Sequence, residues 1–321
     1  MIYYIKFLQA GNGDCIHIFG DGHHVIVDSG EQCAELKDVV REIMDADEAI
    51  DLLVISHYDS DHIKEICNIL QSLTMEERKK LIKKVWFNAT KVGLHGNMKE
   101  WSATDATVFG NYILEADIPW VSELKTGMRE CIAPGLEFEV IDGGEIYAQE
   151  VTGKQLSNVK SDWNKNFAEL EPYLNDKALD TSKTNRQSAI IVAHVNGHDI
   201  LLPGDAIPAK LAGALDQYRK DAIAHFDIVK LPHHGSYKNI TQDILSKMEC
   251  SDYIITTDGT EFFHPNKKMF LKVAKWGINV GDRQFMFHFN YFDDLFPKLC
   301  ITDEDKRNYG FDCDGQRAFE F

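Results

Sequence analysis

Two histidines and two aspartates occur within six residues of one another, at His57, Asp59, Asp61 and His62. Imidazole nitrogen and carboxylate oxygen are both common ligands of divalent metal ions. Charged groups that are crowded together away from water need a compensating partner, and a dication accepts both kinds of donor at once. The spacing therefore predicts a metal-binding loop. The alternative is a solvated, Asp-rich turn in which the histidines are incidental.

The neighbouring residues indicate how this loop is positioned. An apolar run, Leu52 to Ile55, precedes it and is typical of a buried strand, whereas residues 63–73 have the apolar spacing of a helix. In an extended loop between the two, side chains at alternating positions converge on one side. His62 then adds a nitrogen donor where the helix starts.

The segment from His57 to His62 resembles the HxHxDH signature of the metallo-β-lactamase fold, with Asp59 where the second histidine usually stands. This HxDxDH form is similar to that of the hydrolase domain of the competence protein ComEC and of phosphorylcholine esterase. Further matches follow in the expected order: the Gly-rich turn before a strand that ends in Asp28-Ser29-Gly30, the pair Asn185 and Ser188, Gly204-Asp205, Pro232-His233-His234-Gly235-Ser236, and Asp258-Gly259 with His264-Pro265.

The resemblance implies an α/β (α+β) fold, a four-layer αββα sandwich that forms one domain over the whole chain. Residues 90–184 are expected to be a family-specific elaboration, and residues 277–321 form a tail that matches no motif of the family. The elaboration contains two helix-like stretches, 98–116 and 158–174. The second overlaps residues 163–179, which form either an amphipathic lid over the site or a satellite of the core.

The same resemblance implies a centre of two divalent metal ions. The residues that would hold them are His57 and Asp59 for the first ion, Asp61, His62 and His233 for the second, and Asp205 as the bridge. The residues expected to take part in catalysis are Asp61, His234 and His264. For His234, a ligand role in place of His233 and a structural role are the alternatives. His95, the only histidine between residues 62 and 194, is either a further ligand or a surface-loop residue.

Three more polar residues are expected beside these ligands. Asp28 would support the metal loop through hydrogen bonds, and its alternative is an ordinary turn residue. Asn185 and Ser188 would either donate hydrogen bonds to a substrate oxygen or cap the entry to the following strand.

The donor set also indicates a chemistry. Oxygen-rich sites favour Mn²⁺, with Zn²⁺ or iron as alternatives, and a water molecule between two dications becomes a nucleophile near neutral pH. Because both proteins with the similar motif act on phosphodiesters, the resemblance implies a phosphodiesterase or nuclease-like hydrolase. The alternatives are a lactonase, thioesterase or amidase that uses the same nucleophile, and a regulatory component of a larger system.

The net charge of −17 over 321 residues limits the partners. A sequence-independent grip on duplex DNA needs a basic surface, and the basic run from Arg78 to Lys84 is expected to be a solvated helix face, with a phosphate-binding patch as the alternative. A small or single-stranded diester is therefore favoured. Seven cysteines without a CxxC pair are typical of a reducing compartment. We expect a cytoplasmic protein without a signal peptide or membrane span, and the sequence does not indicate its oligomeric state.

Overall fold

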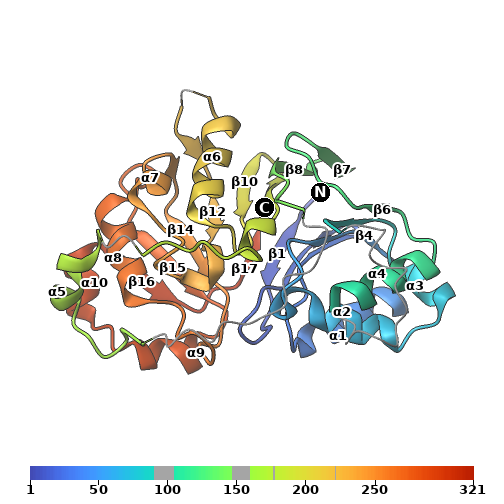
Figure 1. Cartoon of the computed structure of the whole chain (residues 1–321), viewed down its shortest axis with the longest axis horizontal. Coiled ribbons are helices and arrows are strands. Elements are labelled where there is room, and N and C mark those ends of the chain that lie inside the picture. The colour runs from blue at the N-terminus through green and yellow to red at the C-terminus, as the bar shows by residue number, and fades with distance from the viewer. Residues whose placement is uncertain (90–104, 147–159, 176–177, 221) are drawn as a thin grey trace.

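Two mixed sheets stack face to face, and helices cover the outer side of each (Figure 1). The structure, a computed structural model, describes residues 1–89, 105–146, 160–175, 178–220 and 222–321. The first sheet runs in the order β17 (Ala318–Glu320), β1 (Tyr4–Phe7), β2 (Ile16–Gly20), β3 (His23–Val27), β4 (Ile50–Ile55), β5 (Val85–Phe87) and β6 (Trp120–Val121). The second runs in the order β16 (Phe311–Asp314), β15 (Phe285–Phe289), β14 (Asp252–Ile255), β12 (Ile228–Lys230), β10 (His198–Leu202), β9 (Ile190–Val195), β8 (Leu136–Asp142) and β7 (Arg129–Ala133).

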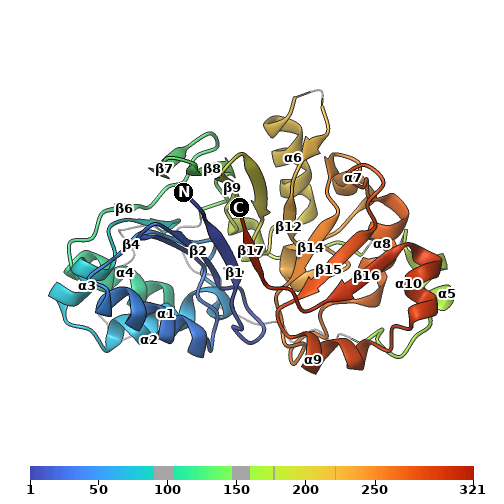
Figure 2. The ribbon, with the colours of Figure 1, turned by 180° about the vertical axis from the view of Figure 1, so that it is seen from behind.

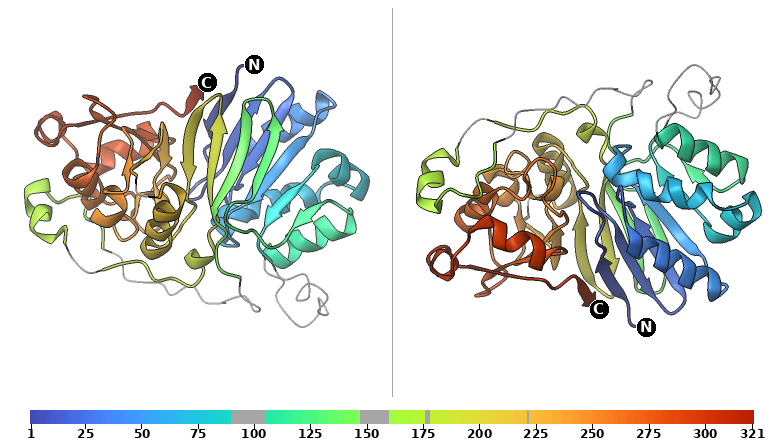
Figure 3. Two further views of the ribbon diagram at one scale, coloured as in Figure 1. Left: turned by 90° about the horizontal axis from the view of Figure 1, so that it is seen from above. Right: turned by 90° about the horizontal axis from the view of Figure 1, so that it is seen from below.

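The helices form the two outer layers, which Figure 3 shows from above and below. Beside the first sheet lie α1 (Ala34–Asp45), α2 (Ser60–Gln71), α3 (Met75–Leu81) and α4 (Asp105–Glu115). Beside the second lie α5 (Phe167–Leu170), α6 (Pro208–Tyr218), α7 (Gln242–Leu245), α8 (Lys267–Trp276), α9 (Phe292–Leu295) and α10 (Asp303–Tyr309). The short strands β11 (Ala224–His225) and β13 (Met248–Glu249) pair with each other. The predicted α/β fold and its four layers are confirmed.

The alternation of side chains in β4 explains why two sheets can stack in this way. Leu52 and Val54 face the core between the sheets, whereas Leu53 and Ile55 face the core under α1 and α2. Successive side chains of a strand point to opposite faces, so a strand with both faces covered is apolar along most of its length. The uninterrupted apolar run before His57 is therefore a consequence of the position of β4 between two hydrophobic cores.

The C-terminal tail belongs to both sheets. β15 and β16 extend the edge of the second sheet in parallel register, and β17 then pairs with β1 at the edge of the first, as seen from behind in Figure 2. The register places Ile5 opposite Phe319. The tail that matches no motif of the family therefore completes the edges of both sheets.

The prediction of a helix over residues 158–174 is wrong for the part that the structure describes. Residues 160–166 are not helical, and only α5 and the 3-10 turn Glu171–Tyr173 follow. Phe167, Leu170 and Leu174 are buried against the core beside the second sheet. Apolar residues at helical spacing can thus be buried by short turns as well as by a helix, and this segment packs as a satellite of the core.

The basic run lies on and just after α3, which begins with a capping box formed by Thr74 and Glu77. Its five basic side chains each pair with a carboxylate: Arg78 with Glu115, Lys79 with Asp117, Lys80 with Asp47, Lys83 with Asp51 and Lys84 with Glu130. Arg78 is buried, contrary to the solvated face that was expected for the whole run.

No helix among the described residues is both long and apolar enough to cross a bilayer.

Candidate metal centre

The centre lies where parallel strands of the two sheets end. In the first sheet β3 and β4 are parallel neighbours, and in the second β10, β12 and β14 are. The carboxyl ends of parallel strands meet at one edge of a sheet, where side chains of the following loops converge. The loops that follow these strands carry the residues of the centre. These are Asp28, the segment from His57 to His62, Asp205, the pair His233 and His234, and Thr256.

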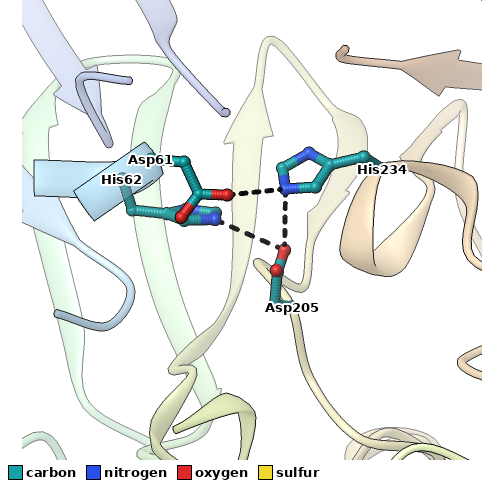
Figure 4. Close-up of side chains that lie close together, drawn as sticks. All are labelled: Asp61, His62, Asp205 and His234. Atoms are coloured by element: carbon teal, nitrogen blue, oxygen red, sulfur yellow. Dashed lines mark ion pairs between the residues drawn. The ribbon is translucent and has the colours of Figure 1, made fainter. Parts of the chain in front are cut away.

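Four of the predicted residues come together as one group: Asp61, His62, Asp205 and His234 (Figure 4). Nε2 of His62 and Nε2 of His234 lie 3.4 Å and 3.5 Å from the same oxygen, Oδ1 of Asp205. Nε2 of His234 also lies 3.5 Å from Oδ2 of Asp61. One ligand atom from each residue lies within 4.8 Å of all the others, an arrangement that could hold a metal ion.

The donor atoms at this point are buried and have no hydrogen-bond partner among the described residues. They are Nε2 of His57, His62 and His234, and Oδ1 of Asp205. An unpaired buried polar atom is costly, and native structures rarely keep several together without a ligand. Divalent cations would satisfy these atoms, so this donor set fits the metals that the sequence predicts.

The opposite nitrogen of each ring is held by the protein. Nδ1 of His62 lies 2.8 Å from Oδ2 of Asp28, and Nδ1 of His234 donates to the carbonyl oxygen of Thr256 at 2.9 Å. In His57, Nδ1 lies 3.1 Å from Oγ of Ser56. When Nδ1 carries the proton, Nε2 carries the lone pair that a metal needs, and the ring cannot turn away.

The carboxylates and imidazoles of the group shift one another's pKa. Burial of the His62 imidazole opposes its protonation, yet the surrounding carboxylates, Asp205 first, raise its pKa well above the usual value. Burial likewise opposes ionisation of Asp205, yet His234 and His233 hold the pKa of its carboxyl well below the usual range. A field that holds a proton on an imidazole also attracts a dication, so protons and metal ions compete for this group.

His57 and Asp59, the pair predicted for the first ion, lie on the same loop with Nε2 of His57 3.6 Å from Oδ2 of Asp59. Asp59 occupies the N-cap position of α2, but its side chain makes no capping hydrogen bond. Its carboxylate is about one-third exposed and remains available to a ligand. The two residues form a donor pair beside the group of four.

His233 and His234 contact opposite oxygens of Asp205. Nε2 of His233 lies 3.6 Å from Oδ2, whereas Nε2 of His234 lies 3.5 Å from Oδ1. Both histidines adopt left-handed backbone angles, with φ of 50° and 54°, a conformation that is uncommon outside glycine and is found at functional sites. Of the two sequence alternatives for the ligand, the geometry groups His234 with Asp61 and His62.

A second carboxylate fixes His233 from behind. Oδ2 of Asp180 lies 3.2 Å from Nδ1 of His233 and accepts hydrogen bonds from Asn185 and Asn239 at 2.6 Å and 2.8 Å. Burial opposes protonation of His233, but Asp205 and Asp180 raise its pKa. Asn185 thus contributes to the hydrogen bonds around His233, and Ser188 accepts a hydrogen bond from the backbone N–H of Asp205 at 3.2 Å.

His264 lies on the far side of His233, with the ring centroids 5.0 Å apart. Its Nδ1 is buried without a hydrogen-bond partner among the described residues. Burial, followed by the nearby His233, lowers its pKa well below the usual value. His264 therefore borders the centre without joining the group of four, and His95 lies outside the described residues.

Sequence reasoning missed three charged residues: Asp14, Asp180 and Lys230. Asp14 accepts a 2.5 Å hydrogen bond from Thr256 and pairs with Lys230. The sequence did contain a signal for Lys230, because this lysine lies within an apolar strand. The structure shows that its side chain is fully buried. The Gly-rich turn before Asp14 also has a physical reason, since a Cβ on Gly13 would lie 1.7 Å from the carbonyl oxygen of Asp61.

No protein-family model and no curated protein matches the chain. Among solved structures, the metallo hydrolase Igni18 from Ignicoccus hospitalis has 12% identity and a TM-score of 0.47, covering 100% of this chain and 99% of its own. YhfI from Bacillus subtilis, a metallo-beta-lactamase fold protein, has 11% identity and a TM-score of 0.44, with coverage of 100% and 99%. Zn²⁺-bound PqqB from Methylobacterium extorquens has 12% identity and a TM-score of 0.45, with coverage of 100% and 99%.

Proposed function

We propose that the protein is a metal-dependent hydrolase that cleaves phosphodiester bonds. The observation that supports this most directly is the convergence of buried, unpaired donor atoms from His62, Asp205 and His234 between the two sheets. Imidazoles whose Nδ1 is already held, beside carboxylate oxygens, are the donors that hydrolases use for catalytic dications. We assign one ion to the group of four and a second to His57 and Asp59, with Asp205 between them.

Bound dications would supply an activated water molecule and polarise the bond under attack. The chain's own residues determine the geometry in which this happens. Asp28 and Thr256 fix the rings of His62 and His234, and Ser188 fixes the backbone of Asp205. Because these partners are buried, the donor set is rigid before any ligand arrives, which lowers the cost of assembling a reactive arrangement.

His233 is suited to proton transfer or phosphate contact. Its side chain is 24% exposed, whereas those of His57, His62 and His234 are almost completely buried. Asp180 holds Nδ1, so Nε2 is left toward the centre and can hold a proton for a leaving oxygen or donate to a phosphoryl oxygen. His264 borders the same side.

The substrate that we propose is a small or single-stranded diester. The net charge of −17 repels a long polyanion. The basic run from Arg78 to Lys84 does not offset this, because each of its basic side chains already pairs with a carboxylate. Recognition therefore depends on the few donors at the centre, which suit one or two phosphates better than a duplex backbone.

A substrate panel tests this proposal. Metal-free protein is reloaded with Mn²⁺ or Zn²⁺ and assayed against bis-p-nitrophenyl phosphate, a short single-stranded oligonucleotide, the matching duplex, a lactone and a thioester. We expect cleavage of the diester and of the single strand, with Asp205→Asn inactive on both. Cleavage of the lactone or thioester with no diester cleavage would overturn the proposed substrate class, and loaded protein inactive on all five would favour a regulatory role.

Two further properties are part of the proposal. The carboxylates Asp59, Asp61 and Asp205 favour Mn²⁺ over softer ions, so we expect Mn²⁺ to support more activity than Zn²⁺. All seven cysteines are free thiols, which supports a reducing, cytoplasmic location.

A further inference from the structure

A buried lysine lies directly beside the centre. Lys230 at the end of β12 and Asp14 in the turn before β2 form an ion pair whose side chains are only 1% and 2% exposed. The ammonium group also donates to the carbonyl oxygen of Gly204 at 3.0 Å. Its third neighbour is Oδ1 of Asp205, 3.7 Å away. A fixed positive charge therefore lies close to the carboxylate that would bridge two metal ions.

Asp14 links this lysine to a ligand. Its Oδ2 pairs with Lys230, while Oδ1 accepts from Thr256 and lies 3.2 Å from Nδ1 of His234. The Asp14 carboxylate therefore contacts both the Lys230 ammonium and a predicted ligand, and it pairs with Lys230 at the point where that charge would otherwise act on Asp205.

We propose that Asp14 anchors the Lys230 ammonium and so prevents it from competing with metal ions for Asp205. Asp14 would then be a positioning residue for the metal centre, although it is not a ligand in the group of four. This inference depends on the proposed metal centre but not on the proposed substrate.

The sign of each substitution follows from Coulomb's law. In Asp14→Asn the ammonium loses its counter-ion, and the nearest carboxylate oxygen left to it is Oδ1 of Asp205. A lysine paired with Asp205 opposes a dication at the same oxygen. Lys230→Met removes the competing charge and leaves Oδ1 of Asp205 to the dication. The double variant has neither the competitor nor the unpaired acid.

The test is a titration of metal-free protein with Mn²⁺ by calorimetry, for wild type, Asp14→Asn, Lys230→Met and the double variant. We expect Asp14→Asn to bind the metal about 10-fold to 100-fold more weakly, the range seen when groups that support metal ligands are lost. We expect Lys230→Met to bind at least as tightly as wild type, and the double variant to recover most of the loss. Thermal unfolding of the metal-free forms shows which variants are folded.

The outcomes separate this inference from the proposed function. If Lys230→Met loses as much affinity as Asp14→Asn, the pair only braces the two sheets, and the proposal is overturned. Where Asp14→Asn does not fold, a 10-fold or greater loss of affinity in Lys230→Met relative to wild type overturns the proposal in the same way. If the double variant is no better than Asp14→Asn, the competition is also refuted. Wild-type protein that binds Mn²⁺ but cleaves no diester contradicts only the proposed substrate, whereas wild type that binds no metal overturns both.

Discussion

Oδ2 of Asp28 lies 2.8 Å from Nδ1 of His62, on the side of the ring opposite the nitrogen that faces Asp205. The other oxygen of Asp28 accepts a 2.7 Å hydrogen bond from the backbone N–H of Ser56. One carboxylate therefore fixes both the ring of a predicted ligand and the start of the loop that carries it. Asp28 itself has a φ of 58°, so the strand end is shaped to place it there.

Asp28→Asn should weaken metal binding without removing a ligand. An amide has only one oxygen to replace the two acceptors, and its NH₂ group faces donors. We expect a loss of about 10-fold to 100-fold in metal affinity, measured by competition with a chromogenic chelator. Asp117→Asn is the matched control, because Asp117 also has a positive φ but lies at the surface. An unchanged affinity in Asp28→Asn would show that the hydrogen bond does not support the ligand.

Substitutions of the two adjacent histidines should have different effects. His234→Ala removes a member of the group of four and should lose bound metal. His233→Ala should keep most of the metal and lower kcat by about 10²-fold to 10⁴-fold, the range for loss of a general acid or base. Elemental analysis and steady-state kinetics on the same preparations distinguish the two. Loss of metal in His233→Ala with retention in His234→Ala would reverse the assignment.

Asp59 should affect one ion selectively. Asp59→Ala should lower the occupancy of the ion that we assign to His57 and leave the group of four occupied. Asp59→His should retain binding but shift the preference from Mn²⁺ toward Zn²⁺, because imidazole is the softer donor. Ser60→Ala, in the neighbouring position, is the control and should change neither property. Wild-type metal content and activity in Asp59→Ala would mark Asp59 as an ordinary loop residue.

His17 predicts a pH dependence that is independent of the centre. Burial, followed by the nearby His24, lowers its pKa from 6.5 to about 3. The unfolded chain therefore binds a proton below pH 6.5, while folded His17 stays neutral until about pH 3. Within this window, stability should fall as the pH falls, by at most about 1.4 kcal/mol per pH unit from this residue.

Urea unfolding of wild type and His17→Phe measures this contribution. The phenyl ring retains the stacking on Phe19, whose centroid lies 4.4 Å from that of His17, but it cannot be protonated. The stability difference between the two proteins should therefore change steadily as the pH is lowered from neutral to about 5, in favour of the variant. A difference that stays constant with pH would contradict the assignment to His17.

The parts of the centre that could be predicted from sequence are those that are local in the chain. The spacing of His57, Asp59, Asp61 and His62 predicted a loop of metal ligands, and the apolar run before them indicated a buried strand. The bond from Asp28 to His62 and the place of Asp205 were consistent with motifs read in order. These features depend on short segments whose conformation is set by nearby residues.

Other features depend on contacts between distant segments. The pair of Asp14 and Lys230 joins the turn before β2 to the end of β12, and no local pattern connects these positions. The distinction between His233 and His234 depends on left-handed backbone angles at both residues. The strand β7 was not predicted, because its polar residues lie at the edge of a sheet where burial imposes little pattern.

The most direct test of the metal centre is the metal content of protein purified without chelators, for wild type and Asp205→Ala, by elemental analysis. Oδ1 of Asp205 lies near both His62 and His234. Because we assign Asp205 a place between the two proposed ions, its loss should affect both. We predict about two transition-metal ions per chain in wild type, and most of that content lost in Asp205→Ala with the fold retained. Wild type without transition metal, or equal metal content in the two proteins, would contradict a metal centre bridged by Asp205.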